Sequence, residues 1–524
     1  MPKEAQTLGE LINKLDKSYF KRPALVIYKE ILSYHDLVEQ ARIIACHLLG
    51  SGFERGDRVA VWLPNGTDFV KLAFGVAMAG MVLVPLNTRL KSVDATETLH
   101  KSNTQALFFT EEFLGIDFFR MVQTIQTSGK VPDLRLVVNM GTNSLMGIHT
   151  WAQWQAKTVP VKDLPSVSAD FPATINSTSG TTSSPKGAVI SHGSLLHIAR
   201  EVGIRMGISE TDRMVSAMPF YHNGGFVPTL LTSLMFGCTL YTQPRFDPEY
   251  VLSTITRNRC TMVGGVGAMF SMMMDSPALA KADLSSLRLV RITGSSDIRR
   301  AVYERFGRLP IFSLYGMTES TAAVTLNCPG DTIEEQLNTN GKPLPETCIR
   351  IVGSKGEKLP LETQGEIWIG GKSLMQGYFR DPDATSQVLT SDGWLRSGDL
   401  GYLDRGGNLV FVGRIKDMYR SGGENVACPE VEEFLRSHPA VLNAAVMGVP
   451  DSRLGEVGFG FLELRPGASA TVEGIQAFCR ENLANFKVPR YIHFRKELPM
   501  TASGRVLKYR LIDEALALLS KKTN

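Results

Sequence analysis

The stretch from Ile175 to Ile190 carries the residue types best suited to chemistry. It reads INSTSGTTSSPKGAVI, so glycine and small hydroxyl residues fill its middle, before Pro185, Lys186 and Gly187. Small side chains leave backbone N–H groups uncovered, and the hydroxyls and the single cation add donors, which is what a polyphosphate needs. The alternative is a flexible Ser/Gly linker, which composition alone favours. Pro185 and Lys186 are not typical of a linker, and hydrophobic sequence flanks the stretch on both sides.

Several other short motifs with reactive or charged residues follow along the chain. Residues 314–319 read LYGMTE and supply an aromatic ring for adenine, a hydroxyl for phosphate and a carboxylate for Mg²⁺. In Ser397-Gly398-Asp399 the carboxylate follows a tight turn, a geometry suited to ribose hydroxyls. Residues 413–417 (GRIKD) and 421–426 (SGGENV) combine charges with a glycine loop. Each motif alone is more often a turn or a solvated charge cluster.

The elements that must position these motifs alternate between strands and helices in the first half of the chain. A helix is expected at 33–49, followed by strands at 59–63, 82–85 and 106–110, with a helix at 65–78 between the first two strands. This alternation predicts parallel α/β layers.

After the Ser/Thr-rich stretch, helices are expected at 194–206 and 226–235. Strands are expected at 213–218, 239–242, 262–266, 287–293 and 311–314, and each ends in a loop of small residues. Ligands of open α/β sheets bind where strands end in loops, so these loops are expected to converge on one site.

Beyond residue 348 short strands and glycine turns predict a compact antiparallel region, and beyond residue 414 the pattern changes again. There a helix at 428–437, strands at 441–449 and 459–464, and a helix at 472–483 predict a self-contained α+β module. The expected fold class is therefore α/β. A large domain of layered α/β subdomains with a small antiparallel β region spans 1–413, a hinge 414–418, and a small α+β domain 419–524.

Composition narrows the class of protein. A chain of 524 residues is too long for a single hydrophobic core, so two or more domains are expected. A net charge of +4 is small for this length and argues against a dedicated nucleic-acid binder. The seven cysteines include no CxxC pair, which favours reduced thiols in a cytoplasmic compartment over disulfides or zinc. The N-terminus has no signal core, and the longest apolar run, 72–86, is too short to span a membrane.

Taken together, in this order and spacing, the motifs resemble the ANL superfamily of adenylate-forming enzymes. That superfamily comprises acyl- and aryl-CoA synthetases, the adenylation domains of peptide synthetases and beetle luciferases. The resemblance covers nearly the whole chain, from Asn65 and residues 85–87 (PLN) to Lys508.

The resemblance implies a role for each motif in binding ATP. The loop after residue 177 would hold the β- and γ-phosphates through Thr178, Ser179, Gly180, Thr181, Thr182 and Lys186. In the motif Tyr315-Gly316-Met317-Thr318-Glu319, the tyrosine would stack on adenine, the threonine would contact the α-phosphate and Glu319 would hold Mg²⁺. Asp399 and Arg414 would bind the ribose.

The resemblance also implies residues for the acid and for CoA. His222 would lie between the nucleotide and the acyl pocket, and Gly294, Ser295 and Ser296 would form the pocket wall. Lys416 occupies the hinge position, and Gly422 and Gly423 match the loop that lines the pantetheine tunnel.

The implied chemistry has two steps and needs no protein nucleophile. A carboxylate attacks the α-phosphate of ATP to give acyl-AMP and pyrophosphate, and a thiol then attacks the acyl carbonyl. Orientation and charge stabilisation supply most of the rate enhancement. In this superfamily the small C-terminal domain turns about the hinge between the steps.

One position departs from the superfamily pattern. A lysine that bridges the carboxylate and the α-phosphate is expected after the Ser-Gly pair near the C-terminus, and here Arg505 follows Ser503-Gly504. Lys508 matches a separate basic position. Arg505 keeps the charge but not the flexible point-charge geometry. Three readings remain: Arg505 does the work with altered geometry, adenylation is slowed, or the lysine was replaced deliberately.

The leading interpretation is an acyl-CoA ligase that uses a free carboxylic acid, ATP and CoA. The alternatives are an enzyme that loads a separate carrier protein, a luciferase-type oxygenase, and an adenylation-impaired binding protein. Residues 262–270 are rich in glycine and methionine, which leaves room for an aliphatic chain. No cationic residue marks a second carboxylate site, so a fatty or other monocarboxylic acid is favoured. A homo-oligomer is compatible with the sequence.

Overall fold

The computed structural model divides into two compact units. The first comprises residues 1–349, 368–396 and 407–409, and the second 350–367, 397–406 and 410–524. The structure describes residues 5–156, 163–178, 186–421, 424–451, 454–483, 485–500 and 506–520. A mixed α/β chain with several sheets in its large N-terminal part confirms the predicted fold class. The predicted domain boundaries at 414–418 stay a prediction.

An eight-stranded sheet organises the N-terminal part of the first unit. Its strand order is β22-β11-β10-β4-β3-β5-β8-β9. The central strands run parallel, with Val59 of β3 beside Leu83 of β4 and Ala106 of β5, which confirms the predicted parallel layers. The bounds are β3 (Arg58–Trp62), β4 (Val82–Pro85), β5 (Ala106–Phe109), β8 (Leu136–Asn139), β9 (His149–Thr150), β10 (Pro172–Thr178), β11 (Lys186–Ser191) and β22 (Gly377–Tyr378).

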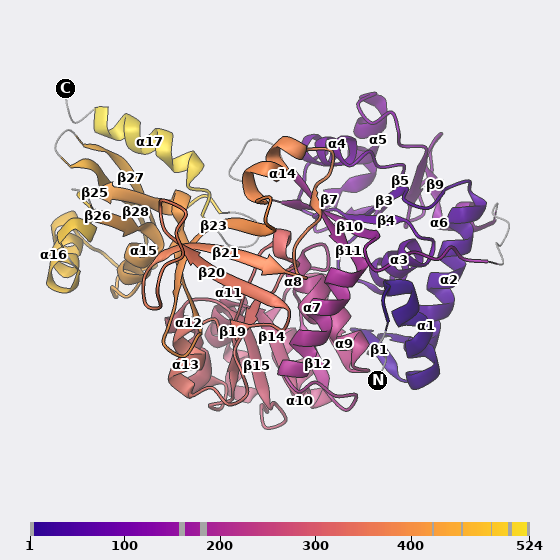
Figure 1. Cartoon of the computed structure of the whole chain (residues 1–524), viewed down its shortest axis with the longest axis horizontal. Coiled ribbons are helices and arrows are strands. Elements are labelled where there is room, and N and C mark those ends of the chain that lie inside the picture. The colour runs from indigo at the N-terminus through magenta and orange to yellow at the C-terminus, as the bar shows by residue number, and fades with distance from the viewer. Residues whose placement is uncertain are drawn as a thin grey trace. The chain divides into compact units, whose positions relative to one another are not determined.

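Helices cover this sheet on both faces (Figure 1). Helices α4 (Ser92–Lys101) and α5 (Phe118–Thr127) bury Leu99 and Phe118 against Trp62 and Phe109 of the strands. Helices α1 (Leu8–Tyr19), α2 (Tyr34–Gly50) and α3 (Thr67–Met78) pack on one another. The apolar run 72–86 is therefore the end of a buried helix followed by β4, as predicted.

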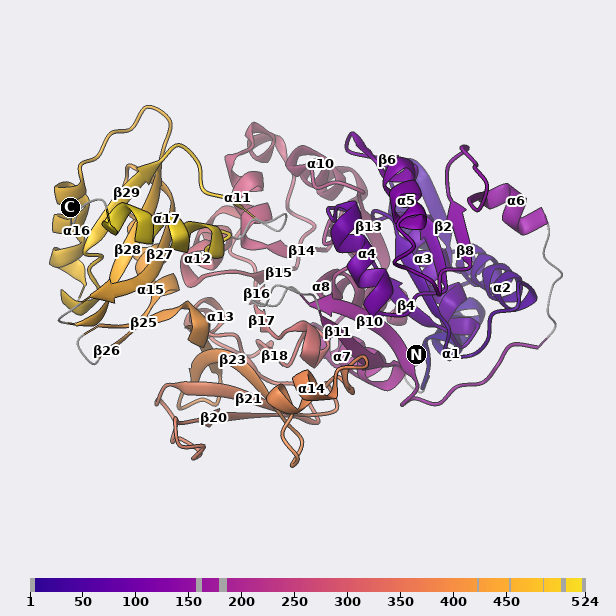
Figure 2. The same cartoon turned by 90° about the horizontal axis from the view of Figure 1, so that it is seen from above.

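A seven-stranded sheet forms the second layer of the first unit, in the order β16-β15-β14-β12-β13-β1-β2. Helices α10 (Pro248–Asn258), α11 (Gly267–Asp275) and α12 (Ser296–Arg305) cover one face, where Val263, Val290 and Ile292 are buried. Figure 2 shows α11 and α12 beside β14 and β15. The strand bounds are β1 (Pro23–Ile27), β2 (Glu30–Ser33), β12 (Arg213–Ser216), β13 (Thr239–Thr242), β14 (Met262–Val266), β15 (Leu289–Thr293) and β16 (Ile311–Phe312).

A four-stranded sheet lies where the chain passes between the units. Its order is β20-β21-β23-β24, and the boundary between the units falls within its strands. The bounds are β20 (Thr347–Val352), β21 (Gly365–Gly371), β23 (Trp394–Leu403) and β24 (Leu409–Arg414).

The C-terminal part of the second unit is a five-stranded sheet with a helical layer on each face. Alternate residues of the long β27–β28 hairpin face opposite ways, so Val446 packs with α15 and α16 while Met447 packs with α17. The labels α15, α16 and α17 mark these helices in Figure 1. The bounds are β25 (Met418–Ser421), β26 (Glu424–Ala427), β27 (Val441–Asp451), β28 (Gly455–Leu464), β29 (Tyr491–Arg495), α15 (Cys428–Arg436), α16 (Val472–Asn482) and α17 (Tyr509–Ser520).

The cysteines and the lengths of the helices relate to the expectations of reduced thiols and of no membrane-spanning segment. All seven cysteines lie among the described residues and none forms a disulfide. Within the described part of the chain, every helix is too short or too polar to cross a bilayer.

Lys508, just before α17, forms an ion pair inside the second unit. Its Nζ lies 2.7 Å from Glu432 Oε1 on α15, and both side chains are largely buried. The same Oε1 accepts a hydrogen bond from the backbone N–H of Val446 on β27. Burial is the largest single influence on the pKa of Lys508 and lowers it, but the charge and hydrogen bond of Glu432, with smaller contributions from Cys428 and Asp417, together raise the pKa above its usual value, so the ammonium is retained at neutral pH. Lys508 therefore has a structural role within its own unit.

We predict that Lys508→Met destabilises the protein by about 3 kcal/mol, because it leaves Glu432 buried without its cation. Arg405→Met is the matched control, because Arg405 pairs with Glu362 on the surface of the same unit, where the pair contributes little. Denaturant unfolding followed by fluorescence measures both variants. Equal stability of Lys508→Met and the parent chain would show that the pair does not hold the unit together.

Candidate active site

The two ends of the Ser/Thr-rich stretch lie on β10 and β11, which form an antiparallel pair in the first unit. Strands β10 and β11 pair through to Thr178 opposite Lys186. Strand β11 begins at Lys186, because Lys186 and Gly187 pair with Thr178 and Ser177 of β10. The expected phosphate ligands Ser179, Gly180, Thr181 and Thr182 lie outside the described residues. The two that are described, Thr178 and Lys186, face each other across the base of the hairpin.

Tyr378 on β22 connects this hairpin to the second motif. It pairs with Ala188 of β11, and the Lys186 ammonium lies 5.1 Å from the centre of its ring. Its hydroxyl donates a 2.8 Å hydrogen bond to Glu319 Oε1. Burial, reinforced by the Glu319 charge, raises the pKa of Tyr378 well above its usual value, so the phenol stays protonated and donates. Lys186, Tyr378 and Glu319 thus form one connected group.

The motif around Glu319 is a strand that ends in a single tight turn. Tyr315 ends β17 (Leu314–Tyr315), Gly316 and Met317 follow, and Thr318 opens the 3₁₀ helix η3 (Thr318–Ser320). Tyr315 is buried and Glu319 is only 7% exposed. The Glu319 carbonyl accepts from the backbone N–H of Met375, so main-chain and side-chain bonds both fix this carboxylate near β22.

The surroundings of Glu319 fit a divalent cation. Among the described residues its carboxylate has no cationic partner, and a buried anion without one is costly. No group of three or more metal-ligating side chains occurs in the described part of the chain. Mg²⁺ suits such a site, because it takes one or two protein carboxylates and completes its shell with phosphate oxygens and water.

The loop that carries His222 is anchored by Asn65. The Asn65 amide donates to the Met218 carbonyl at 3.0 Å and accepts from the Phe220 N–H at 2.8 Å. His222 is exposed and precedes the short helix α8 (Asn223–Gly225), whose Asn223 Nδ2 donates to the Thr318 carbonyl at 3.4 Å. The structure therefore brings the His222 loop against the turn that carries Glu319.

Gly294, Ser295 and Ser296 connect the end of β15 to α12. Ser295 is the residue before the helix and Ser296 its first residue. A side chain at Gly294 would come within 2.6 Å of Ile298 and 3.4 Å of Gly267, so the loop lies directly on its neighbours. These three residues lie in the first unit with Tyr315 and Glu319.

Asp399 and Arg414 come together inside the second unit. They lie on the adjacent strands β23 and β24, with Arg414 Nε 3.4 Å from Asp399 Oδ1. The tight turn expected at 397–399 is wrong, because these residues lie inside the continuous strand β23, where Gly398 adopts a left-handed φ of +69° and Ser397 Oγ accepts from the Asp399 N–H. The side chain of Lys416 and the residues Gly422, Gly423 and Arg505 lie outside the described residues.

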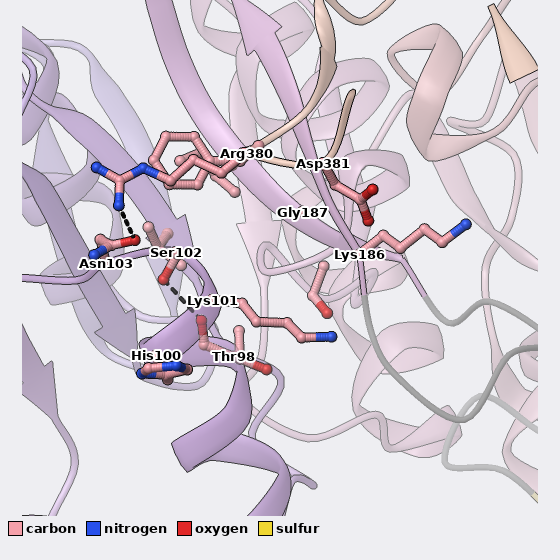
Figure 3. Close-up of a pocket in the computed structure, with 13 residues that line it drawn as sticks. Thr98, His100, Lys101, Ser102, Asn103, Lys186, Gly187, Arg380 and Asp381 are labelled. Carbon is pink, nitrogen blue, oxygen red and sulfur yellow. Dashed lines mark hydrogen bonds between the residues drawn. The ribbon is translucent and has the colours of Figure 1, made fainter. Parts of the chain in front are cut away.

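A cavity of about 460 Å³ in the first unit is lined in part by residues of β10 and β11. Figure 3 shows Lys101 of α4 and Lys186 of β11 on its wall, with Arg380 hydrogen-bonded to Asn103. Asp381 is its only acidic lining residue among those described. Of the expected ATP ligands that the structure describes, only Lys186 lines this cavity, so the cavity adjoins the β10–β11 pair and is not the whole nucleotide site.

Sequence reasoning missed Tyr378. It is followed by an ordinary Phe-Arg-Asp-Pro turn and no local pattern marks it. Its importance comes from the pairing of β22 with β11, strands almost 190 residues apart in sequence. Only the observation that Glu319 needs a donor could have prompted a search for it.

Comparison with known proteins is consistent with this geometry. A family model described as AMP-binding enzyme matches residues 14–379, and one described as AMP-binding enzyme C-terminal domain matches residues 430–505. The putative acyl-CoA synthetase YngI of Bacillus subtilis (strain 168) is 32% identical, over 98% of each chain. The medium-chain acyl-CoA ligase ACSF2 of Mus musculus is 32% identical over 97% of this chain and 87% of its own. The crystal structure of the anthranilate CoA ligase AuaEII shares the fold, with a TM-score of 0.89 at 24% identity over 98% of each chain.

Proposed function

This chain belongs to the AMP-binding enzyme family and is an AMP-forming acid–CoA ligase, and we propose that it activates a fatty acid. The observation that carries the assignment of the site is the connected group of Lys186, Tyr378 and Glu319. It joins a phosphate-type hairpin to a buried carboxylate, the two features that an ATP site needs.

In the proposed first step, the carboxylate oxygen of the acid attacks the α-phosphorus of ATP, and the bond to the bridging oxygen breaks. The products are acyl-AMP and pyrophosphate. Lys186 and residues 178–182 hold the β- and γ-phosphates, Tyr315 stacks on adenine, and Thr318 donates to the α-phosphate. No protein group forms a covalent bond, so the rate comes from alignment and charge.

Glu319 is the proposed protein ligand of Mg²⁺. The bound ion would neutralise the phosphate charge that repels the incoming carboxylate. Tyr378 donates to one carboxylate oxygen and leaves the other for the ion, and it fixes the side-chain rotamer from the side of the hairpin.

In the proposed second step, the thiolate of CoA attacks the acyl carbonyl and AMP leaves. Asp399 and Arg414 are the proposed ribose ligands, since the aspartate presents acceptors for two hydroxyls and the arginine fixes its orientation. His222 is proposed to border the reacting carbonyl. Lys416 is proposed to act at the hinge, and Gly422 and Gly423 to line the path of pantetheine.

The fatty-acid assignment has two supports. A relative that matches almost this whole chain is named a medium-chain acyl-CoA ligase. Strand β14 and helix α11 also carry glycines and methionines next to the Gly294 loop, and methionine adapts readily to an aliphatic chain.

Product formation tests this function directly. Purified protein, ATP, Mg²⁺, CoA and a panel of straight-chain acids should yield acyl-CoA by mass spectrometry, and acyl-AMP should accumulate when CoA is omitted. Acyl-AMP without thioester would favour an acceptor other than CoA, such as a separate carrier protein. Neither product with any acid would overturn the assignment.

We predict that Arg505→Lys accelerates adenylation roughly tenfold, because restoring one well-placed charge-assisted hydrogen bond is worth about 1.4 kcal/mol in the transition state. Carboxylate-dependent ATP–pyrophosphate exchange measures the effect, with Arg510→Lys of the exposed face of α17 as the control. Equal exchange rates in the parent chain and Arg505→Lys would mean that arginine performs this role unaided.

We predict that Tyr378→Phe weakens divalent-cation binding about tenfold without unfolding the protein, because the Glu319 carboxylate loses its only side-chain donor among the described residues. Mn²⁺ binding in the presence of ATP, followed by electron paramagnetic resonance, gives a readout independent of turnover. Tyr303→Phe is the control, because the Tyr303 hydroxyl makes no hydrogen bond in the described structure. Unchanged Mn²⁺ affinity in Tyr378→Phe would separate Tyr378 from the metal site.

A further inference from the structure

Arg291 is a cation buried inside the first unit. It lies in the middle of β15 and is 3% exposed. Its neighbours Val290 and Ile292 belong to the core shared with α10, α11 and α12, so Arg291 projects from the opposite face of the sheet. A side chain at Gly264 on β14 would come within 2.8 Å of Arg291 Nη2, so this glycine makes room for the guanidinium.

Arg291 is poorly satisfied by the protein. Among the described residues its side chain makes one hydrogen bond, donated from Nη2 to Thr229 Oγ1 at 2.6 Å, and Nε is buried without a partner there. No carboxylate of the described residues pairs with it. Burial lowers its pKa to about 10, so it remains charged at neutral pH. An arginine kept only for stability would be paired, because a buried charge without a counter-ion is costly.

Hydrogen bonds connect the surroundings of Arg291 to the candidate active site. Thr229 Oγ1 donates to the Gly224 carbonyl at 3.2 Å, and Gly224 follows Asn223 in the His222 loop. Asn223 Nδ2 bonds the Thr318 carbonyl, while its Oδ1 is buried without a partner. Two unsatisfied polar atoms, Asn223 Oδ1 and Arg291 Nε, therefore lie along one hydrogen-bonded connection from Thr318 to β15.

The helix that holds Thr229 has an unusual geometry. Residues 226–235 were expected to form one α-helix, but Phe226–Leu231 form a π-helix and only Thr232–Met235 are α-helical. The wider turn brings the Thr229 hydroxyl onto the carbonyl five residues earlier. Such π segments occur preferentially at functional sites.

We propose that Arg291 binds a second carboxylate at the far end of the fatty-acid chain, so that the enzyme prefers α,ω-dicarboxylic acids to the monocarboxylic acids expected from the sequence. This deepens the proposed function and rests on it. Gly294, the expected wall of the acyl pocket, directly follows β15, the strand that carries Arg291 at its centre. The two carboxylates would therefore be several carbons apart. A carboxylate accepts from Nε and a neighbouring Nη of one guanidinium in parallel, and it also supplies the missing negative charge.

The test compares saturated monocarboxylic acids with α,ω-dicarboxylic acids of equal chain length in ATP–pyrophosphate exchange. For the parent enzyme, kcat/KM for the best diacid should exceed that for its monoacid partner about tenfold or more, the usual worth of a hydrogen bond to a charged group. In Arg291→Met the preference should reverse. Arg300→Met removes a surface cation of α12 that pairs with Glu334 and should keep the preference of the parent enzyme.

Thermal unfolding distinguishes recognition from a structural role. Arg291→Met should be at least as stable as the parent protein, because methionine removes an unpaired buried charge. If that variant does not fold, the parent enzyme's preference and its thermal shift with diacid against monoacid in the presence of ATP decide the question.

Equal kcat/KM for both members of every pair, or a diacid preference that persists in Arg291→Met, would overturn the proposal. A preference for an oxo acid over the diacid of equal length would overturn the choice of a carboxylate. If acyl-CoA forms but Arg291→Met has the same diacid-to-monoacid preference as the parent enzyme, this proposal fails and the ligase assignment holds. The absence of adenylate and thioester with every acid defeats the ligase assignment itself.

Discussion

The hydrogen bond from Tyr378 to Glu319 is the contact on which the rest of the candidate site depends. It joins an edge strand of the eight-stranded sheet to a turn that follows a strand of a different, three-stranded sheet. Because Tyr378 also lies beside Lys186, the same residue sets the spacing between the phosphate hairpin and the carboxylate. A phosphate grip and a metal ligand are useful only at a fixed separation, and here one buried phenol provides it.

The second unit has its own hydrophobic core and its own buried ion pair. Its five-stranded sheet has a helical layer on each face. In its largely buried Lys508–Glu432 ion pair, the glutamate also accepts a hydrogen bond from the backbone of β27. Asp399 and Arg414 are likewise positioned by neighbouring strands within this unit. The proposed nucleotide ligands of each unit are thus positioned by contacts within that unit.

The sequence predicted the parts of the fold that local patterns encode. Alternation between strand and helix periods indicated parallel layers, and the spacing of the motifs around Thr178, Tyr315 and Asp399 indicated an adenylate-forming enzyme. It could not indicate Tyr378, because the role of that residue arises from pairing between distant strands. The π-helix was equally hidden, since a π turn and an α turn carry the same apolar pattern over six residues. Arg291 sits in a hydrophobic strand sequence, where its lack of a counter-ion becomes visible only in three dimensions.

Two buried charges of opposite sign, Glu319 and Arg291, occur in the first unit, and among the described residues neither has an ionic partner. Pairing each with a protein side chain would have stabilised the fold, because an uncompensated buried charge is among the more costly features of an interior. Both instead belong to hydrogen-bonded connections that meet near Thr318, one through Tyr378 and β22 and the other through Thr229 and Asn223. Two buried charges that lack ionic partners and are both connected to the region of Thr318 are best explained by ligands that carry the opposite charges. For Glu319 the ligand is a cation that accompanies a polyphosphate. For Arg291 it is an anionic group on the acid itself, so the two charges would be neutralised together only when both substrates are bound.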